Sequence, residues 1–98
     1  MLREDTLAKW NEPYQQVLVE SYEPAVRTGL HGPIHVRPCE GQGYPVDLHV
    51  SCSSDLKDRQ RHEVGTKFRI QAKLTDRKGG GEYLFSDYRW PYVVVSKP

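Results

Sequence analysis

Apolar and polar residues alternate most strictly in the stretch that begins after Thr66 and ends at Asp76. The apolar positions of this stretch are Phe68, Ile70, Ala72 and Leu74, and the positions between and beside them are Lys67, Arg69, Gln71, Lys73 and Thr75. A period of two residues is typical of a β-strand that turns one face toward a core. The pattern therefore predicts a strand over 67–75 with one apolar face and one basic face.

A glycine-rich turn follows this strand. Residues 77–81 read Arg-Lys-Gly-Gly-Gly, and glycine adopts the backbone angles that tight turns require. The segment after the turn, 82–90, is rich in aromatic residues. We therefore expect a β-hairpin whose second strand covers 82–90.

Four other segments have the pattern of strands. They are 15–22, 34–37, 46–52 and 92–96, where β-branched or alternating apolar residues stand between glycines and prolines. The polar segment 53–63 forms either a single helical turn, capped by Ser54 or Asp55, or a long exposed loop. Residues 1–12 are expected to form an N-terminal arm or a short helix that Pro13 limits.

These elements predict a mainly β fold. Five or six short strands favour a small antiparallel barrel, OB-like or SH3-like, with one short helix at most. An α+β fold with a single antiparallel sheet is the alternative. A chain of 98 residues is long enough for one modest core, so we expect a single domain over 1–98.

The charge distribution adds a positive patch to this picture. Residues 1–56 carry four basic and eight acidic side chains, whereas residues 57–78 carry eight basic and three acidic ones. The chain as a whole has a net charge of +1. A basic middle on a near-neutral chain is expected either to form one positive surface or to remain a solvated face without a partner.

The first ten residues are charged and lack an apolar core segment, and no long apolar run follows. We therefore expect a cytoplasmic protein that does not enter a membrane. The two cysteines are expected to remain free thiols, as is usual in a reducing compartment.

The hairpin carries the main functional hypothesis, which depends on its register. If Leu84, Tyr88 and Trp90 point into the core, then Tyr83 and Phe85 stand on the outer face beside the basic residues of the first strand. A shift of one residue would instead bury both rings. In the first register, cations would hold phosphates and flat rings would stack bases, as single-stranded nucleic acid requires.

The sequence thus predicts a non-enzymatic binding module for single-stranded nucleic acid. Its predicted binding residues are Lys67, Arg69, Lys73, Arg77, Lys78, Tyr83 and Phe85. The first alternative is a protein-interaction or regulatory module that binds a protein partner, through the acidic N-terminal half or at an open sheet edge. The second basic cluster, 57–62, would join the nucleic-acid face only if it folds beside it.

A small hydrolase or phosphodiesterase is the third hypothesis. It would use His62 with Glu63 or Glu82 as an acid–base pair, or Cys39 as a nucleophile with His35 as its base. The histidines and cysteines lack the spacing of a zinc site, since no Cys-x-x-Cys pair exists. We therefore expect neither a metal nor a cofactor.

Overall fold

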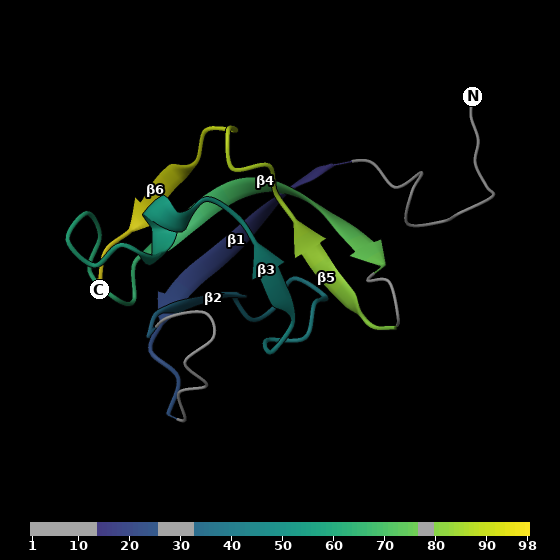
Figure 1. The fold of residues 1–98 in the computed structure, drawn as a ribbon, viewed down its shortest axis with the longest axis horizontal. Coiled ribbons are helices and arrows are strands. Elements are labelled where there is room, and N and C mark those ends of the chain that lie inside the picture. The colour runs from purple at the N-terminus through teal and green to yellow at the C-terminus, as the bar shows by residue number, and fades with distance from the viewer. Residues whose placement is uncertain (1–13, 26–32, 77–79) are drawn as a thin grey trace.

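The computed structural model describes residues 14–25, 33–76 and 80–98, which form a mainly β structure (Figure 1). Its strands are β1 (Gln15–Tyr22), β2 (His35–Pro38), β3 (His49–Ser51), β4 (Lys67–Asp76), β5 (Glu82–Phe85) and β6 (Val93–Ser96), and its one 3-10 turn is η1 (Ser54–Lys57). The predicted fold class is therefore confirmed. The arm or helix expected at 1–12 lies outside the described residues. No helix in the described ranges is long and apolar enough to cross a membrane.

The strands form one sheet in the order β2-β1-β4-β5-β3, with β6 also paired to β4. The sheet curls so far that its end strands β2 and β3 approach each other, which leaves the barrel nearly closed (Figure 1). The described pairs are antiparallel except β3 with β5, which is parallel. The expectation of a wholly antiparallel barrel is wrong for this pair. β4 lies between β3 and β5 in the sequence and runs opposite to β5, so the chain reverses twice and β5 runs in the same direction as β3. The OB-like or SH3-like type of the barrel stays a prediction.

Strand β4 is the longest and lies at the centre of the sheet. Along one edge its residues 67–72 pair with β1. The other edge is divided, because residues 73–76 pair with β5 and residues 67–69 pair with β6. The segment 86–92 leaves the sheet between these two short strands and returns to it.

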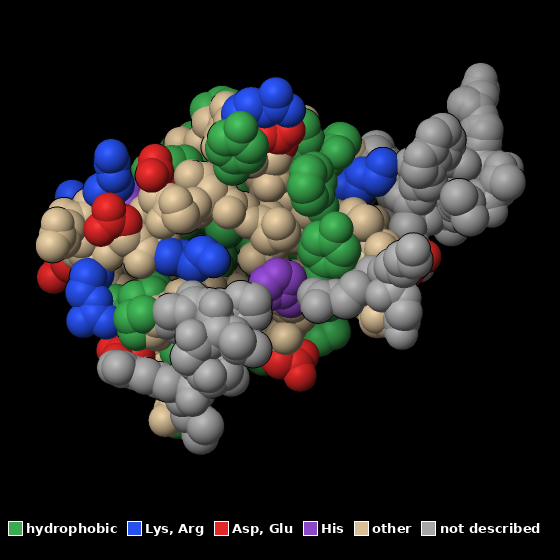
Figure 2. Space-filling model, in the orientation of Figure 1, with side chains coloured by type: hydrophobic (Ala, Val, Ile, Leu, Met, Phe, Trp, Pro, Cys, Tyr) green, Lys and Arg blue, Asp and Glu red, His purple; other side chains and the backbone are tan. Residues whose placement is uncertain are grey.

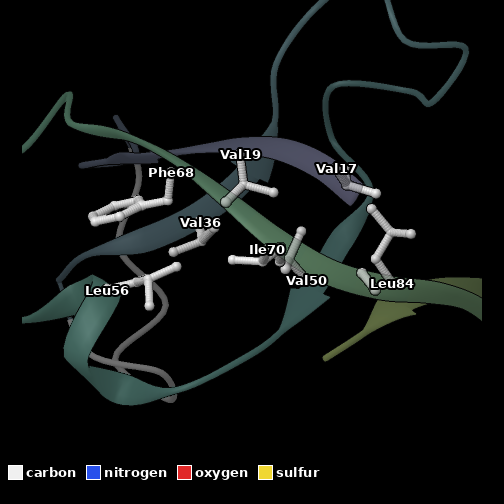
Figure 3. Close-up of a cluster of buried hydrophobic side chains, with 9 residues drawn as sticks. Val17, Val19, Val36, Val50, Leu56, Phe68, Ile70 and Leu84 are labelled. Carbon is white, nitrogen blue, oxygen red and sulfur yellow. The ribbon is translucent and has the colours of Figure 1, made fainter. Parts of the chain in front are cut away.

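The core fills the inside of the curled sheet (Figure 3). Its nine buried apolar residues are Val17, Val19, Val36, Val50, Leu56, Phe68, Ile70, Ala72 and Leu84. Alternating residues of β1 and β4 supply most of them, as the period of two predicts. Leu56 comes from η1 and closes one side of the cluster.

Three predicted boundaries are wrong. The strand expected at 46–52 is only His49–Ser51, because Leu48 N–H bonds to Pro45 C=O at 3.1 Å and closes a turn over the first residues. The strand expected at 82–90 ends at Phe85. The predicted helical turn exists, but Ser53 caps it rather than Ser54 or Asp55, since Ser53 Oγ accepts Asp55 N–H at 3.2 Å.

The side chain of Gln42 pairs with β1 beyond the end of β2. Gln42 Oε1 accepts the Leu18 N–H at 2.8 Å, and Gln42 Nε2 donates to Leu18 C=O at 2.8 Å and to Cys39 C=O at 2.9 Å. Gly41 and Gly43, with φ of +90° and +89°, form the turn that brings Gln42 to this position. The amide group thus gives β1 the hydrogen bonds that a further strand residue would provide.

Candidate functional site

The outer face of β4 is basic, as the alternation predicts. Lys67, Arg69 and Gln71 are exposed on this face, while Phe68 and Ile70 point into the core. The structure gives Lys67 and Arg69 no ion pair within the described residues. Two cations therefore project from this face toward solvent.

The register of β5 brings aromatic rings beside these cations. Leu84 lies opposite Leu74 and is fully buried, so the residues on either side of it face outward. Phe85 lies opposite Lys73, and Tyr83 lies opposite Thr75. Both rings are half-buried on the outer face. This is the register that the nucleic-acid hypothesis requires, although the hypothesis expected more exposed rings.

Trp90 covers part of this outer face, so the expectation that it points into the core is wrong. Its indole lies edge-on to Tyr14, with ring centroids 4.7 Å apart, and 6.3 Å from Phe85. The side chain of Tyr88, also expected in the core, is 72% exposed. Of Tyr88, Trp90 and Tyr92, which are spaced two residues apart, only Tyr92 is half-buried against the core cluster.

A local turn explains why the alternation fails after Phe85. Asp87 Oδ1 accepts the Arg89 N–H at 2.9 Å, and the Trp90 N–H donates to Asp87 C=O at 3.0 Å. An aspartate that accepts hydrogen bonds from backbone N–H groups two and three residues further on favours a turn over a strand. The chain therefore folds back and lays Trp90 over the sheet.

Tyr14 belongs to the same cluster, although the sequence did not single it out as a site residue. Because Gln15 pairs with Ala72, Tyr14 stands next to Lys73 on the outer face. The Lys73 Nζ lies 5.3 Å from the centre of the Tyr14 ring, which is a cation–π distance. The period of two along β1 places Tyr14 on the same face as Gln16 and would have identified it once β1 was known to pair with β4.

The candidate site is therefore a row that runs from the residue before β1, across β4 and β5, to the segment that follows β5. We call it the aromatic row, and its members are Tyr14, Lys73, Phe85 and Trp90. Figure 2 shows hydrophobic side chains gathered over β5 and the segment that leads to β6. The predicted residues Arg77 and Lys78 lie outside the described residues.

A carboxylate lies at the far end of this face. Glu20 is paired with Lys67 in the register, and Glu20 Oε2 accepts a hydrogen bond from Arg37 Nε at 2.9 Å. The Arg37 guanidinium also lies 4.3 Å from the centre of the Tyr22 ring. The charge of Glu20 is thus balanced by cations, and the net charge of the face is positive.

The second basic cluster serves a different part of the surface. Arg61 lies 3.8 Å from Asp55 and 3.6 Å from Asp58, and Arg59 lies 3.9 Å from Glu23. These exposed pairs are loose and weak, but each cation has a carboxylate nearby. Nothing in these pairings joins residues 57–62 to the aromatic row.

The described geometry disfavours the acid–base hypotheses. His62 Nε2 and the Tyr92 hydroxyl are 2.9 Å apart, and the His62 ring packs edge-on against Phe68 at 5.0 Å. These contacts are typical of a structural histidine. Glu82 pairs with the last residue of β4, whereas His62 precedes the first, so the ten residues of the strand, about 30 Å, lie between His62 and Glu82.

The two cysteines are free, as expected, and neither is activated. Burial, followed by the charge of Glu20, raises the pKa of the Cys39 thiol. Burial also raises the pKa of Cys52 to about 11. A nucleophilic thiol needs a lowered pKa, so these shifts disfavour thiol catalysis. Within the described ranges, no three His, Cys, Asp or Glu side chains gather as a metal site would require.

No family model, curated protein or solved structure matches this chain.

Proposed function

We propose that this protein binds single-stranded nucleic acid, without catalysis, through the outer face of β4 and β5. The observation that carries the proposal is the aromatic row, in which Tyr14 and Phe85 lie beside Lys73 on a sheet face and Trp90 packs against both rings. Arg69 and Lys67 continue the same face along β4. Cations held beside rings are the arrangement that single strands use.

The cations and the aromatic rings contribute to binding in different ways. Lys67 and Arg69 attract phosphates, and this attraction is independent of base sequence. The rings of Trp90 and Phe85 stack on unpaired bases, each worth about 1–3 kcal/mol. A duplex hides the faces of its bases, so the row favours a single strand. A reducing compartment such as the cytoplasm suits the two free thiols.

Fluorescence anisotropy with labelled oligothymidylate and oligouridylate, each of about twelve nucleotides, tests the proposal. If Lys67, Arg69 and Lys73 each contact one phosphate, log Kd changes with log salt concentration with a slope of magnitude about 2. Binding that ignores salt would contradict the proposal.

Two pairs of variants locate the binding face. Arg69→Glu is expected to weaken binding several-fold and to reduce the salt slope by about 0.7, whereas Arg59→Glu, the same change on the other surface, leaves both unchanged. Trp90→Ala is expected to weaken binding about fivefold or more, and Tyr88→Ala, which removes an exposed ring outside the row, has a smaller effect. Equal effects within either pair would overturn the assignment of the site.

A further inference from the structure

Strand β6 is exposed in a way that the proposed function does not use. Its residues Val93, Val94 and Val95 are 52%, 36% and 41% exposed. Within the described part of the chain, β6 pairs with β4 alone, and its other edge faces no strand (Figure 1). Three valines and a row of backbone hydrogen-bonding groups thus lie at the margin of the sheet.

Such an edge is usually protected. Proteins place lysines, prolines or inward charges within an edge strand, because an open apolar edge pairs readily with other chains. Pro91 and Lys97 lie outside the four residues of β6, and none of the four is charged. β6 has two milder protections, its length of four residues and a bulge at Val95, but within the described residues both leave the backbone groups of its outer edge unpaired. The edge therefore remains competent to pair.

The surroundings of β6 are basic. Arg69 pairs with Val93, Lys67 pairs with Ser96, and Lys97 follows the strand. A hollow of about 370 Å³ lies beside it, lined by Arg61, His62, Glu63, Thr66, Val94 and Lys97. Glu63 is the one carboxylate in the lining, and Arg61 already has Asp55 and Asp58 nearby, so Lys97, together with Lys67 and Arg69 of β4, supplies the positive charge. An acidic ligand is therefore favoured at this edge.

We propose that β6 is a docking edge for an extended segment of a partner protein in which apolar and acidic residues alternate. The segment adds to the sheet as a new strand, and its main chain pairs with the open edge of β6. Its apolar side chains pack on the exposed valines. Its acidic side chains, which all lie on the other face of the added strand, meet Lys97 and Arg61 at the hollow.

Charge decides between this occupant and a second copy of the chain. Two copies joined through β6 would each bring Arg61, Lys67, Arg69 and Lys97 to the same junction. Like charges at an interface are unfavourable, whereas an acidic segment neutralises them. The edge thus fits a foreign acidic strand better than it fits itself.

The test measures the binding of labelled synthetic peptides by fluorescence anisotropy. The first is a blocked peptide of alternating valine and glutamate, the second has lysine in place of glutamate, and the third has proline in place of the valines. The first peptide is expected to bind about tenfold more tightly than either of the others, because only it combines acidic charge with a backbone that forms a strand.

Variants then assign the binding to β6. Val93→Lys is expected to weaken binding of the glutamate peptide about tenfold, while Tyr88→Lys, which makes the same change at an exposed aromatic side chain outside β6, leaves it unchanged. Lys97→Glu, which leaves the valines intact, reduces the preference for glutamate over lysine. Circular dichroism checks that each variant is folded. Phe85→Ala, which removes a ring of the aromatic row on β5, leaves binding of the glutamate peptide unchanged, and this separates the edge of β6 from the nucleic-acid site.

Three results would overturn the proposal. The first is equal binding of the glutamate and lysine peptides. The second is peptide binding that Val93→Lys and Lys97→Glu leave intact. The third is a dimer, measured by analytical ultracentrifugation, that Val93→Lys dissociates, because the occupant of the edge would then be a second copy.

Discussion

Strands β5 and β6 lie along the same edge of β4 but differ in how well they are covered. β5 is held between β4 and β3, and its Leu84 is fully buried. β6 pairs with β4 only, and its three valines remain at least 36% exposed. The valines have the stronger intrinsic preference for strands, so composition does not explain the difference. The neighbouring strand explains it, because β3 extends far enough to cover β5 and not β6.

This difference assigns the two strands different uses. β5 has no open edge among the described strands, so what it offers a ligand is its outer face with Tyr83 and Phe85. β6 offers an open edge whose backbone pairs with an added strand. Of the two strands along this edge of β4, β5 thus offers side chains to a ligand and β6 offers backbone groups.

The largest expected effect is a difference in the free energy of unfolding between a variant of β5 and a variant of β6. Leu84→Ala is expected to lower the free energy of unfolding by about 3 kcal/mol, because it leaves a cavity in the core. Val93→Ala is expected to change it by about 0.5 kcal/mol at most, since the side chain is mostly exposed. Urea unfolding of both variants checks the comparison, which fails if the two losses are similar.

The next effect concerns Gln42, whose side-chain amide pairs with the edge of β1. Without it, this edge would be open, as the outer edge of β6 is. Gln42→Ala removes the amide that pairs with Leu18 and Cys39. It is expected to lower the free energy of unfolding by about 2 kcal/mol. Gln60→Ala serves as the control, because Gln60 is exposed in a loop. Equal losses in urea unfolding would mean that the amide has no special role.

A smaller effect tests how β6 is attached. Tyr92 precedes β6, and its hydroxyl lies 2.9 Å from His62 Nε2. Tyr92→Phe keeps the ring against Phe68 but removes the hydrogen bond, so a loss of about 1 kcal/mol is expected. Faster hydrogen exchange at the β6 amides than at the β5 amides would accompany it. Tyr88→Phe, at an exposed ring, is the matched control.

The smallest effect concerns the turn between the two strands and depends on pH. Hydrogen bonds from Arg89 lower the pKa of Asp87 from its usual 3.8 to about 2. A carboxyl whose pKa is lowered in the folded state stabilises that state above pH 3.8, and this contribution is lost as the pH falls through about 2. In an NMR titration, Arg89→Ala should return the midpoint of Asp87 toward 3.8. An unchanged midpoint would contradict the assigned cause.

The sequence predicted the elements whose side chains alternate against a core. The pattern around Phe68 and Ile70 identified β4 but left two registers open for β5, and the structure has the register in which Leu84 is buried. It failed where a short-range hydrogen bond competes with the strand, as at Asp87 and Arg89. The spacing of Tyr88, Trp90 and Tyr92 continues the period of two, so nothing in the pattern marks the end of the strand at Phe85.

The candidate site was predicted in part for the same reason. The structure places five predicted residues on one face, as one of the two possible hairpin registers required: Lys67, Arg69, Lys73, Tyr83 and Phe85. Tyr14 and Trp90 join them through contacts between distant segments, which a local pattern does not contain. The exposed edge of β6 is also invisible in the sequence, because it depends on where β3 ends.

The central position of β4 has a consequence for how the chain folds. β1 pairs with β4 from Gln15 to Glu20, and these partners are separated by about half of the sequence. During synthesis from the N-terminus, β1 is therefore made long before its main partner leaves the ribosome. Closing so long a loop precedes any gain from the pairing, so we expect slow folding and a period in which the nascent N-terminal segment requires protection from aggregation.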